Sequence, residues 1–409
     1  MKEYSELIKK GSFTIIALLF FYIGQGIPLP GYLVNFKLPQ GSFTLERLLS
    51  LTTGGLFSSP TLFALGLGPY MTVSILFSVI FFANRNLSSQ ISQEQRGRLE
   101  IIGIFFMSIL QGIPLAFNLK NSVIPKISFL SPLNIFLFTV LCFVVGALLI
   151  SWLASLNIIY GLGGPFVLLL PGIIRGITGS LGANYRSILV HFDRLIPFIF
   201  ISVIFVGITI AIYSAEYRFE IQRIGIDKYS KEAYIGFRLL IAGSLPLMFA
   251  TTLMYFPYYL MQLFNYENDA VLALFNTAKL NGILMYGLIL YLLGVLFSFI
   301  NIMPDQLSDD LKESGDYILE IKPGEETKRY ISRRVWGVSL IGGLYLPLIV
   351  TIPLLVGLIT GHTSISNLSN YFTMLFVLVV IYDNLQQDVV FLFYKNNYEL
   401  FGNNRRNFK

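Results

Sequence analysis

The chain has 409 residues, of which 55% are hydrophobic and only 13% are charged, and its mean hydropathy is +0.68. Soluble domains carry about 25% charged residues, so this composition excludes an ordinary soluble enzyme, and the apolar content excludes a disordered chain. A membrane-spanning helix needs about 20 residues, so the chain has room for about ten spans with loops. The single cysteine, Cys142, excludes a disulfide framework and a thiolate metal site.

Ten apolar runs without charged residues or histidine follow one another along the chain. They predict an all-α polytopic membrane protein with ten transmembrane helices. The runs lie at 11–28, 69–83, 101–117, 132–156, 164–174, 195–213, 239–259, 283–303, 336–360 and 370–382. Ion-coupled carriers usually place ionisable residues inside such spans. A secondary transporter for a small solute is therefore a weaker alternative, and a scaffold for other membrane proteins is a second one.

The basic residues predict the orientation in the membrane. If the N-terminus is cytoplasmic, 21 of the 29 Lys and Arg residues fall in segments on the cytoplasmic side. The positive-inside rule then places both termini in the cytoplasm. The net charge of +6 is accordingly interpreted as topology, not as a nucleic-acid site.

Two cytoplasmic segments, 214–238 and 304–334, are unusually long. In the first, Tyr217, Phe219 and Ile221 alternate with charged residues, and this period of two predicts a strand. The second is acidic from Asp305 to Glu320 and basic from Lys322 to Arg334. This division fits a solvated loop paired within itself and, equally well, a docking surface for a cytoplasmic partner.

The apolar segment 53–70 is unsuited to a continuous span because glycine and proline interrupt helices. Its interruptions are Gly54, Gly55, Pro60, Gly66, Gly68 and Pro69. Broken backbone at membrane depth is tolerated only where it is buried in protein or lines an aqueous cavity. We therefore expect a half-helix over Thr53–Leu65 inside the bundle, followed by a new span from Pro69. An external loop is the alternative.

The sequence contains neither a GxxxxGK[ST] loop nor an HExxH motif, and no Ser/His/Asp grouping is apparent. It thus offers no catalytic group, no cofactor site and no metal site. If the function of the chain is driven by ATP hydrolysis, a partner protein would have to bind and hydrolyse the ATP. These absences predict a membrane protein that is not an enzyme.

Four stretches carry a family resemblance. They are "YIGQGIPLPG" at 22–31, "FALGLGPYMTVSIL" at 63–76, "AGSLPLMFATTLMYFP" at 242–257 and "LKESGDYILEIKPGEETKRYI" at 311–331. With the broken segment and the polarised loop, they resemble the SecY family, the protein-conducting channel of the bacterial plasma membrane. Lys322 stands where the family usually has arginine before Pro-Gly, and Leu319-Glu320 replaces a usual Pro-Gly. Such departures resemble the accessory SecY paralogue of Gram-positive bacteria.

The resemblance implies two pseudo-symmetric halves, 1–180 with spans 1–5 and 181–409 with spans 6–10, around an hourglass pore. It implies a ring of apolar residues at the waist, namely Leu67, Met71, Leu169, Met248 and Phe376. An apolar constriction of this kind excludes water and ions by dewetting. It also implies a plug at about 53–67, which includes Thr53, Gly54, Gly55, Leu56, Phe57, Pro60 and Phe63.

A lateral gate is implied between spans 2 and 3 and spans 7 and 8, with Thr72 and Phe256 facing each other. The implied function is the export of unfolded polypeptide, here serine-rich glycosylated adhesins, driven by a SecA-type ATPase. The bases implied to dock that motor are Arg218, Arg223, Lys322, Lys328, Arg329, Arg333 and Arg334. Further implied partners are small SecE-like and SecG-like or accessory subunits, the translocating polypeptide and membrane lipid.

Overall fold

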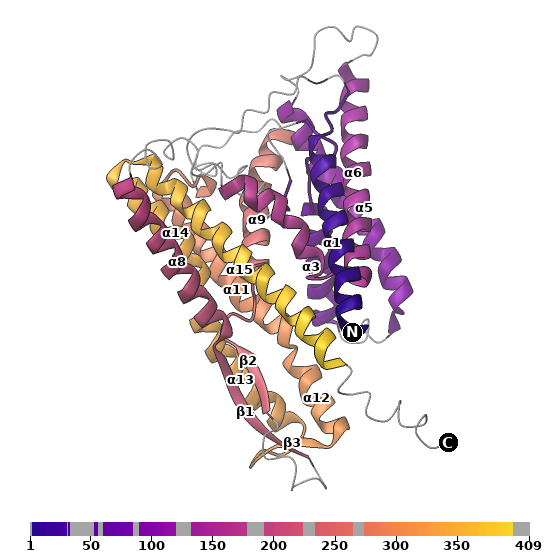
Figure 1. Ribbon diagram of the computed structural model, residues 1–409, viewed down its shortest axis with the longest axis vertical. Coiled ribbons are helices and arrows are strands. Elements are labelled where there is room, and N and C mark those ends of the chain that lie inside the picture. Colours follow the sequence, from indigo (N-terminus) through magenta and orange to yellow (C-terminus); the bar gives the residue numbers. More distant parts are fainter. Residues whose placement is uncertain are drawn as a thin grey trace.

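The computed structural model describes residues 2–30, 32, 53–55, 60–84, 90–119, 132–177, 192–223, 234–264 and 274–395. Within these ranges the chain is mostly helical, and a small sheet lies beyond the helices at one end (Figure 1). The expectation of a helical membrane protein is confirmed, with the sheet as an addition to it.

The N-terminal part includes four long helices and a short 3₁₀ helix, which continues as α-helix to Ile177. They are α1 (Lys2–Gly26), α3 (Gly68–Ala83), α5 (Gln93–Asn118), α6 (Pro132–Tyr160) and the 3₁₀ helix η2 (Pro165–Leu169). Proline stands in the first turn of α3, where its missing N–H costs nothing. Ser92 and Gln95 form a reciprocal capping box that begins α5.

The C-terminal part supplies seven helices in the described ranges. They are α8 (Phe192–Ser214), α9 (Leu245–Phe264), α11 (Leu280–Ile302), α12 (Pro304–Ser314), α13 (Glu325–Gly342), α14 (Tyr345–Thr360) and α15 (Thr363–Lys395). In Figure 1 they gather on the opposite side from α1, α3, α5 and α6, and α15 crosses between the two groups. The helices thus form two groups in chain order.

Among the described residues, seven helices are long and apolar enough to cross a membrane. Three shorter apolar helices coincide with the remaining runs: Gly68–Ala83, Pro165–Ile177 and Leu245–Met254. The ninth run, 336–360, is divided between α13 and α14. A side chain on Gly342 would overlap the Leu239 carbonyl, so glycine is required where the helix is interrupted.

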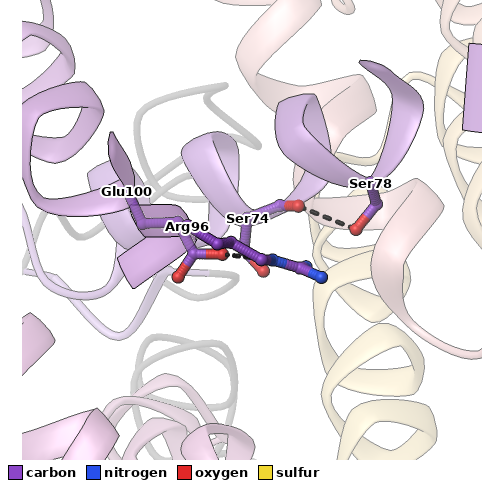
Figure 2. A network of polar contacts seen from close by, with 4 residues as sticks. All are labelled: Ser74, Ser78, Arg96 and Glu100. Atoms are coloured by element: carbon purple, nitrogen blue, oxygen red, sulfur yellow. Dashed lines mark hydrogen bonds and ion pairs between the residues drawn. The ribbon is translucent and has the colours of Figure 1, made fainter. Parts of the chain in front are cut away.

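Helices α3 and α5 lie side by side, and one end of the pair carries polar groups that bond within each helix. Arg96 of α5 pairs with Glu100 one turn further on, at 3.1 Å between Nε and Oε1. Figure 2 shows this pair beside Ser74 and Ser78 of α3, whose own hydrogen bond runs from the Ser78 hydroxyl to the Ser74 carbonyl. The guanidinium also lies 4.8 Å from the centre of the Phe81 ring. This end of the helix pair therefore satisfies its charges locally.

The sheet joins two segments that the sequence presented as separate loops. Strands β1 (Glu216–Arg223), β2 (Tyr234–Arg238) and β3 (Asp316–Ile318) are antiparallel and ordered β2-β1-β3. Phe219 pairs with Ile235, and Gln222 pairs with Tyr317. The predicted strand at 217–221 is confirmed.

Segment 304–334, expected as a loop, is in fact α12, β3 and the first half of α13. The segment is amphipathic, with apolar residues at every third or fourth position, as in a helix that packs on one face. This pattern was overlooked because most of the residues between them are charged or polar. A small apolar core joins these elements to the sheet. It consists of Phe219, Phe237, Leu311, Ile318, Ile331 and Val335. We call the sheet, α12 and residues 325–335 of α13 the cytoplasmic unit, after the side of the membrane on which the basic residues predict it to lie.

The turn at Gly161–Gly164 ties the two groups of helices together. Asn157 of α6 donates to the Gly164 carbonyl at 2.6 Å, and the Gly163 amide donates to the Asp388 carboxylate of α15 at 2.7 Å. The Leu162 amide donates to the Thr14 hydroxyl of α1 at 2.8 Å. Both Gly163 and Gly164 have φ in the left-handed region, at 73° and 59°, which other residues rarely adopt.

Candidate channel axis and cytoplasmic face

The five predicted ring residues come from four helices and one adjoining turn. Leu67 caps α3, Met71 lies in its first turn, Leu169 ends η2, Met248 lies near the start of α9, and Phe376 is in the middle of α15. All five belong to one hydrophobic cluster, and none is more than 4% exposed. The fold therefore buries these distant positions in the same large apolar cluster, which is compatible with an apolar constriction.

The segment expected to form the plug is anchored to this cluster. The Leu67 amide donates to the Thr53 carbonyl at 2.8 Å, and Gly54 lies against Leu169, so a side chain there would contact the Leu169 backbone. The buried side chain of Gln25 in α1 donates to the Gly54 carbonyl. Gln25 was not predicted as a site residue; its only signal in the sequence is a polar residue at the end of an apolar run.

The half-helix expected over Thr53–Leu65 is wrong over Thr61–Leu65, where a bridge residue is followed by successive turns that run on to Leu67. Gly66 has a φ of 56°, and a side chain there would overlap the backbone of Gly55. This close backbone approach replaces the regular helical bonding that the apolar composition suggested. The Pro60 carbonyl accepts from the Leu29 amide at 2.9 Å, which ties the turns to the end of α1. Two of the predicted plug residues, Leu56 and Phe57, lie outside the described residues.

Aromatic stacking adds to the anchoring of the turns. Phe63 is 2% exposed and stacks on Phe21 of α1, with ring centres 6.0 Å apart and planes 17° apart. A side chain on Gly24 would overlap the Phe63 ring, so the glycine provides the space that the ring occupies. The described part of the predicted plug is therefore packed, not loosely held.

The predicted gate lies where the two groups of helices meet. Helix α9 contacts both α3 and α5, and α11 contacts α3. Thr72 is buried on α3, where its hydroxyl donates to the Gly68 carbonyl at 2.8 Å and accepts from Gln111 of α5 at 3.3 Å. Phe256 is 40% exposed on α9. The two gate residues thus lie on neighbouring helices, one inside the bundle and one at its surface.

Most of the predicted docking bases lie on or beside the cytoplasmic unit. Arg218 pairs with Glu216 at 3.3 Å, and its guanidinium lies 4.4 Å from the centre of the Tyr234 ring. Lys328 pairs with Asp305 at 3.3 Å, which joins α13 to α12. The side chains of Lys322, Arg329, Arg333 and Arg334 are exposed, and Arg223 is described only by its backbone in β1. The sheet therefore brings bases from both predicted loops onto one body.

An ion pair that the sequence analysis missed joins the sheet to α15. Arg238 of β2 contacts the Asp383 carboxylate at 2.5 Å, with the side chains 32% and 19% exposed. Burial disfavours the charge on Arg238, but the hydrogen bond to Asp383 and the attraction of its charge outweigh burial and raise the arginine pKa. The sequence signal was an isolated acid just beyond an apolar run. This pair offers a direct mechanical link from the cytoplasmic unit to the helix that carries Phe376.

In the described ranges no three His, Cys, Asp or Glu side chains gather in a way that could hold a metal ion. These ranges provide instead a buried apolar cluster, a segment anchored to it and a charged face at one end. Such an arrangement is suited to passage across a membrane.

The SecY family model matches residues 61–384, which is most of the chain. The chain therefore belongs to the SecY family, whose members are protein-conducting channels and not enzymes. Among curated relatives, the accessory Sec system protein translocase subunit SecY2 of Leuconostoc gelidum subsp. gasicomitatum is 32% identical over 96% of both chains. The SecY2 subunit of Streptococcus oralis is 29% identical over 86% of this chain and 87% of its own. The predicted resemblance to the accessory branch is confirmed.

Solved structures show the same fold. One described as the structure of a protein conducting channel has a TM-score of 0.68 and 13% identity, and the match covers 97% of this chain and 95% of the other. Sec61 in the canine ribosome-channel complex from the endoplasmic reticulum has a TM-score of 0.63 at the same identity and coverage. The chain is thus a multi-pass membrane protein with the fold of the SecY and Sec61 channels.

Proposed function

We propose that the chain is the channel subunit of an accessory protein translocase in the plasma membrane and passes unfolded polypeptide along the axis defined by the ring residues. The observation that carries this proposal is the convergence of Leu67, Met71, Leu169, Met248 and Phe376 in one buried cluster. A charge-free ring presents no ionic partner to a passing chain. Methionine adapts its shape to different side chains, which suits a seal around varied sequences.

In the proposed architecture, ten membrane-spanning helices form halves 1–180 and 181–409. The packed turns at 60–67, with the preceding residues of the plug, close the axis in the resting state. The proposed plug is held by the Gln25 hydrogen bond and by the stacking of Phe63. Displacement of this segment would open the channel across the membrane. Separation of α3 and α5 from α9 and α11 would open it laterally, toward lipid.

The proposed driving partner is a SecA-type ATPase that docks on the cytoplasmic unit, and the proposed cargo is serine-rich glycosylated adhesins. Small SecE-like and SecG-like or accessory subunits would complete the complex. The ring of Tyr4 in α1 lies 5.5 Å from that of Phe393 in α15, so the start of the first helix and the end of the last are adjacent. They lie at the same end as the sheet in Figure 1, which supports two cytoplasmic termini.

Crosslinking of the proposed gate tests the function directly. The variant Cys142→Ser removes the only cysteine, and Thr72→Cys with Phe256→Cys then adds one to each side. Oxidation should join α3 to α9 and nearly abolish adhesin export by membranes that carry the motor and small subunits, and reductant should restore it. The measurement combines gel mobility of the channel with protease protection of the exported chain.

Each single-cysteine variant in the same background serves as a control and should export normally under oxidation. Absence of crosslinking would contradict the gate assignment. Full export by the crosslinked channel would contradict the gating step. Uptake of a small solute by vesicles that contain this chain alone would favour the secondary transporter instead.

A further inference from the structure

A groove of about 450 Å³ lies between the start of β1, the residue after β2 and one face of α13. Its lining is mostly apolar. The lining residues are Ala215, Glu216, Tyr217, Leu239, Arg333, Arg334, Gly337, Val338 and Ile341. Along α13 the two arginines come first and Ile341 comes two turns later, at about 1.5 Å per residue. The groove is therefore basic at its cytoplasmic end and apolar where α13 approaches α14.

The basic end is held in position by aromatic rings. The guanidinium of Arg334 lies 5.1 Å from the centre of the Tyr330 ring and 5.5 Å from that of Tyr217. Among the residues that the structure describes, Arg333 forms no ion pair. The one acid in the lining, Glu216, pairs with Arg218 outside the groove. The groove thus presents positive charge that its own acid does not neutralise.

The apolar end continues onto the surface that faces lipid. Ile341 is 68% exposed, and Leu340 and Leu344 beside it are also exposed. Along α13, Trp336 lies between the arginines and the apolar residues; it is 51% exposed and its ring packs against Phe299 of α11. Tryptophan is common at such membrane boundaries. Gly337 leaves the middle of the groove open, since a side chain there would contact nothing.

We propose that this groove is a binding site for one anionic phospholipid of the cytoplasmic leaflet. The phosphate would bind Arg333 and Arg334, because guanidinium groups match phosphate oxygens in a bidentate way. One acyl chain would lie along Gly337, Val338 and Ile341. A lipid is favoured over a peptide because the groove opens directly onto the lipid-facing surface and combines a cationic end with an apolar one. The site is separate from the channel axis, although Arg333 and Arg334 are also among the proposed motor-docking bases. Its test uses the chain without the motor and measures lipid contact, so it can fail or succeed independently of export.

Fluorescence quenching by brominated lipids tests the proposal, because the chain has only two tryptophans. In Trp152→Phe, Trp336 is the sole reporter; it lies on the same turn of α13 as Gly337, with its ring against Phe299 of α11 and outside the groove lining. The full chain is reconstituted in vesicles with equal amounts of phosphatidylglycerol and phosphatidylcholine, with bromine on the acyl chains of one lipid or the other. Brominated phosphatidylglycerol should quench Trp336 more strongly than brominated phosphatidylcholine. Equal quenching by the two lipids would overturn the proposal.

Variants identify the site. The double change Arg333→Gln and Arg334→Gln should remove the excess quenching by phosphatidylglycerol, whereas Arg98→Gln on α5 should leave it intact. Gly337→Leu, which fills the groove, should also remove the excess. Gly207→Leu is the matched control, because Gly207 of α8 likewise has nothing within 4 Å of an added side chain. An excess that survives Gly337→Leu would place the lipid elsewhere and overturn the assignment to this groove.

The second tryptophan supplies the folding control. Trp336→Phe leaves Trp152, which is 60% exposed on α6 and far along the chain from the groove. Its quenching should be equal for the two brominated lipids. In the arginine and glycine variants, quenching of Trp336 by phosphatidylcholine should stay at least as strong as before, which reports correct insertion. An equal excess of phosphatidylglycerol at both tryptophans would indicate general attraction to a basic protein and would also overturn the proposal.

Discussion

The channel axis and the cytoplasmic unit solve opposite problems. The axis gathers residues from α3, η2, α9 and α15 into a cluster that excludes water almost completely. The described part of the cytoplasmic unit has a core of six buried residues, with charged side chains around it. A seal depends on every residue that lines it, whereas a docking face needs only a stable body that holds its charges in place. Substitutions in the predicted axis should therefore cause ion leakage, whereas substitutions in the cytoplasmic unit should weaken motor binding.

The largest expected effect is in the cytoplasmic unit. Phe219→Ala removes a ring that is 6% exposed and packs 5.2 Å from Phe237. Loss of a buried phenylalanine costs about 3–5 kcal/mol, which is a large share of the stability of so small a core. Hydrogen exchange in β1 and β2 should accelerate and the affinity for the motor should fall, without any ion leak in planar bilayers.

Leu319→Ala is the matched control in the same unit, because Leu319 is 49% exposed. It should change stability by no more than about 0.5 kcal/mol. Ion leakage in Phe219→Ala would show that the two regions are not separable in the way proposed.

The second prediction tests whether a ring residue differs in its effect on ion conductance from other residues of the same buried cluster. Leu168 and Leu169 are adjacent and both 0% exposed in the same cluster, but only Leu169 is assigned to the ring. Each change to alanine should cost about 2 kcal/mol, the low end for a buried leucine, because lipid is as apolar as the protein interior. Only Leu169→Ala should raise the resting ion conductance of the reconstituted channel.

Equal conductance in the two variants would contradict the assignment of Leu169 to the ring. Thermal unfolding in detergent provides the comparison of stability. If the two variants differ strongly in stability, the conductance should be compared at temperatures equally far below each transition.

The smallest expected effect is a gain in stability. Glu320 has a φ of 64°, a left-handed backbone that costs a residue with a side chain about 1–2 kcal/mol. Glu320→Gly should relieve this strain and, after the entropy lost by glycine, stabilise the cytoplasmic unit by about 1 kcal/mol. Slower hydrogen exchange in β3 would report the gain. The reciprocal change Gly324→Ala, at a φ of 103°, should destabilise the same turn; a stabilised Gly324→Ala would contradict the argument.

Local sequence signals predicted those helices and strands whose formation does not depend on one particular residue far away in the chain. Long apolar runs predicted the helices because lipid burial demands them, whatever their neighbours. The alternation of Tyr217, Phe219 and Ile221 with charged residues predicted β1, because this pattern lies within the strand itself. By contrast, β3 has only three residues and exists because β1 offers it hydrogen bonds. No local pattern could have revealed it.

The turns at 60–67 show a second way in which prediction failed, because here the local composition suggested the wrong structure. Their apolar composition suggested a half-helix, but the chain is held by bonds to distant positions: Leu67 to Thr53, and Pro60 to Leu29. These partners satisfy backbone groups that a helix would otherwise have satisfied internally. The ring assignment rests only on the resemblance to a family and stays a prediction, since an isolated apolar residue in a span carries no mark of its role.

The sequence by itself determined that this protein spans a membrane many times, which family it resembles and which end carries its basic residues. Composition and charge decide these properties because transfer of a segment into lipid depends on that segment alone. Only the tertiary structure decided that Leu67 and Phe376 share one dry cluster, that Arg238 is bound to Asp383, and that two arginines border an open groove. These depend on residues far apart in the chain, whose proximity follows from packing and not from any local pattern.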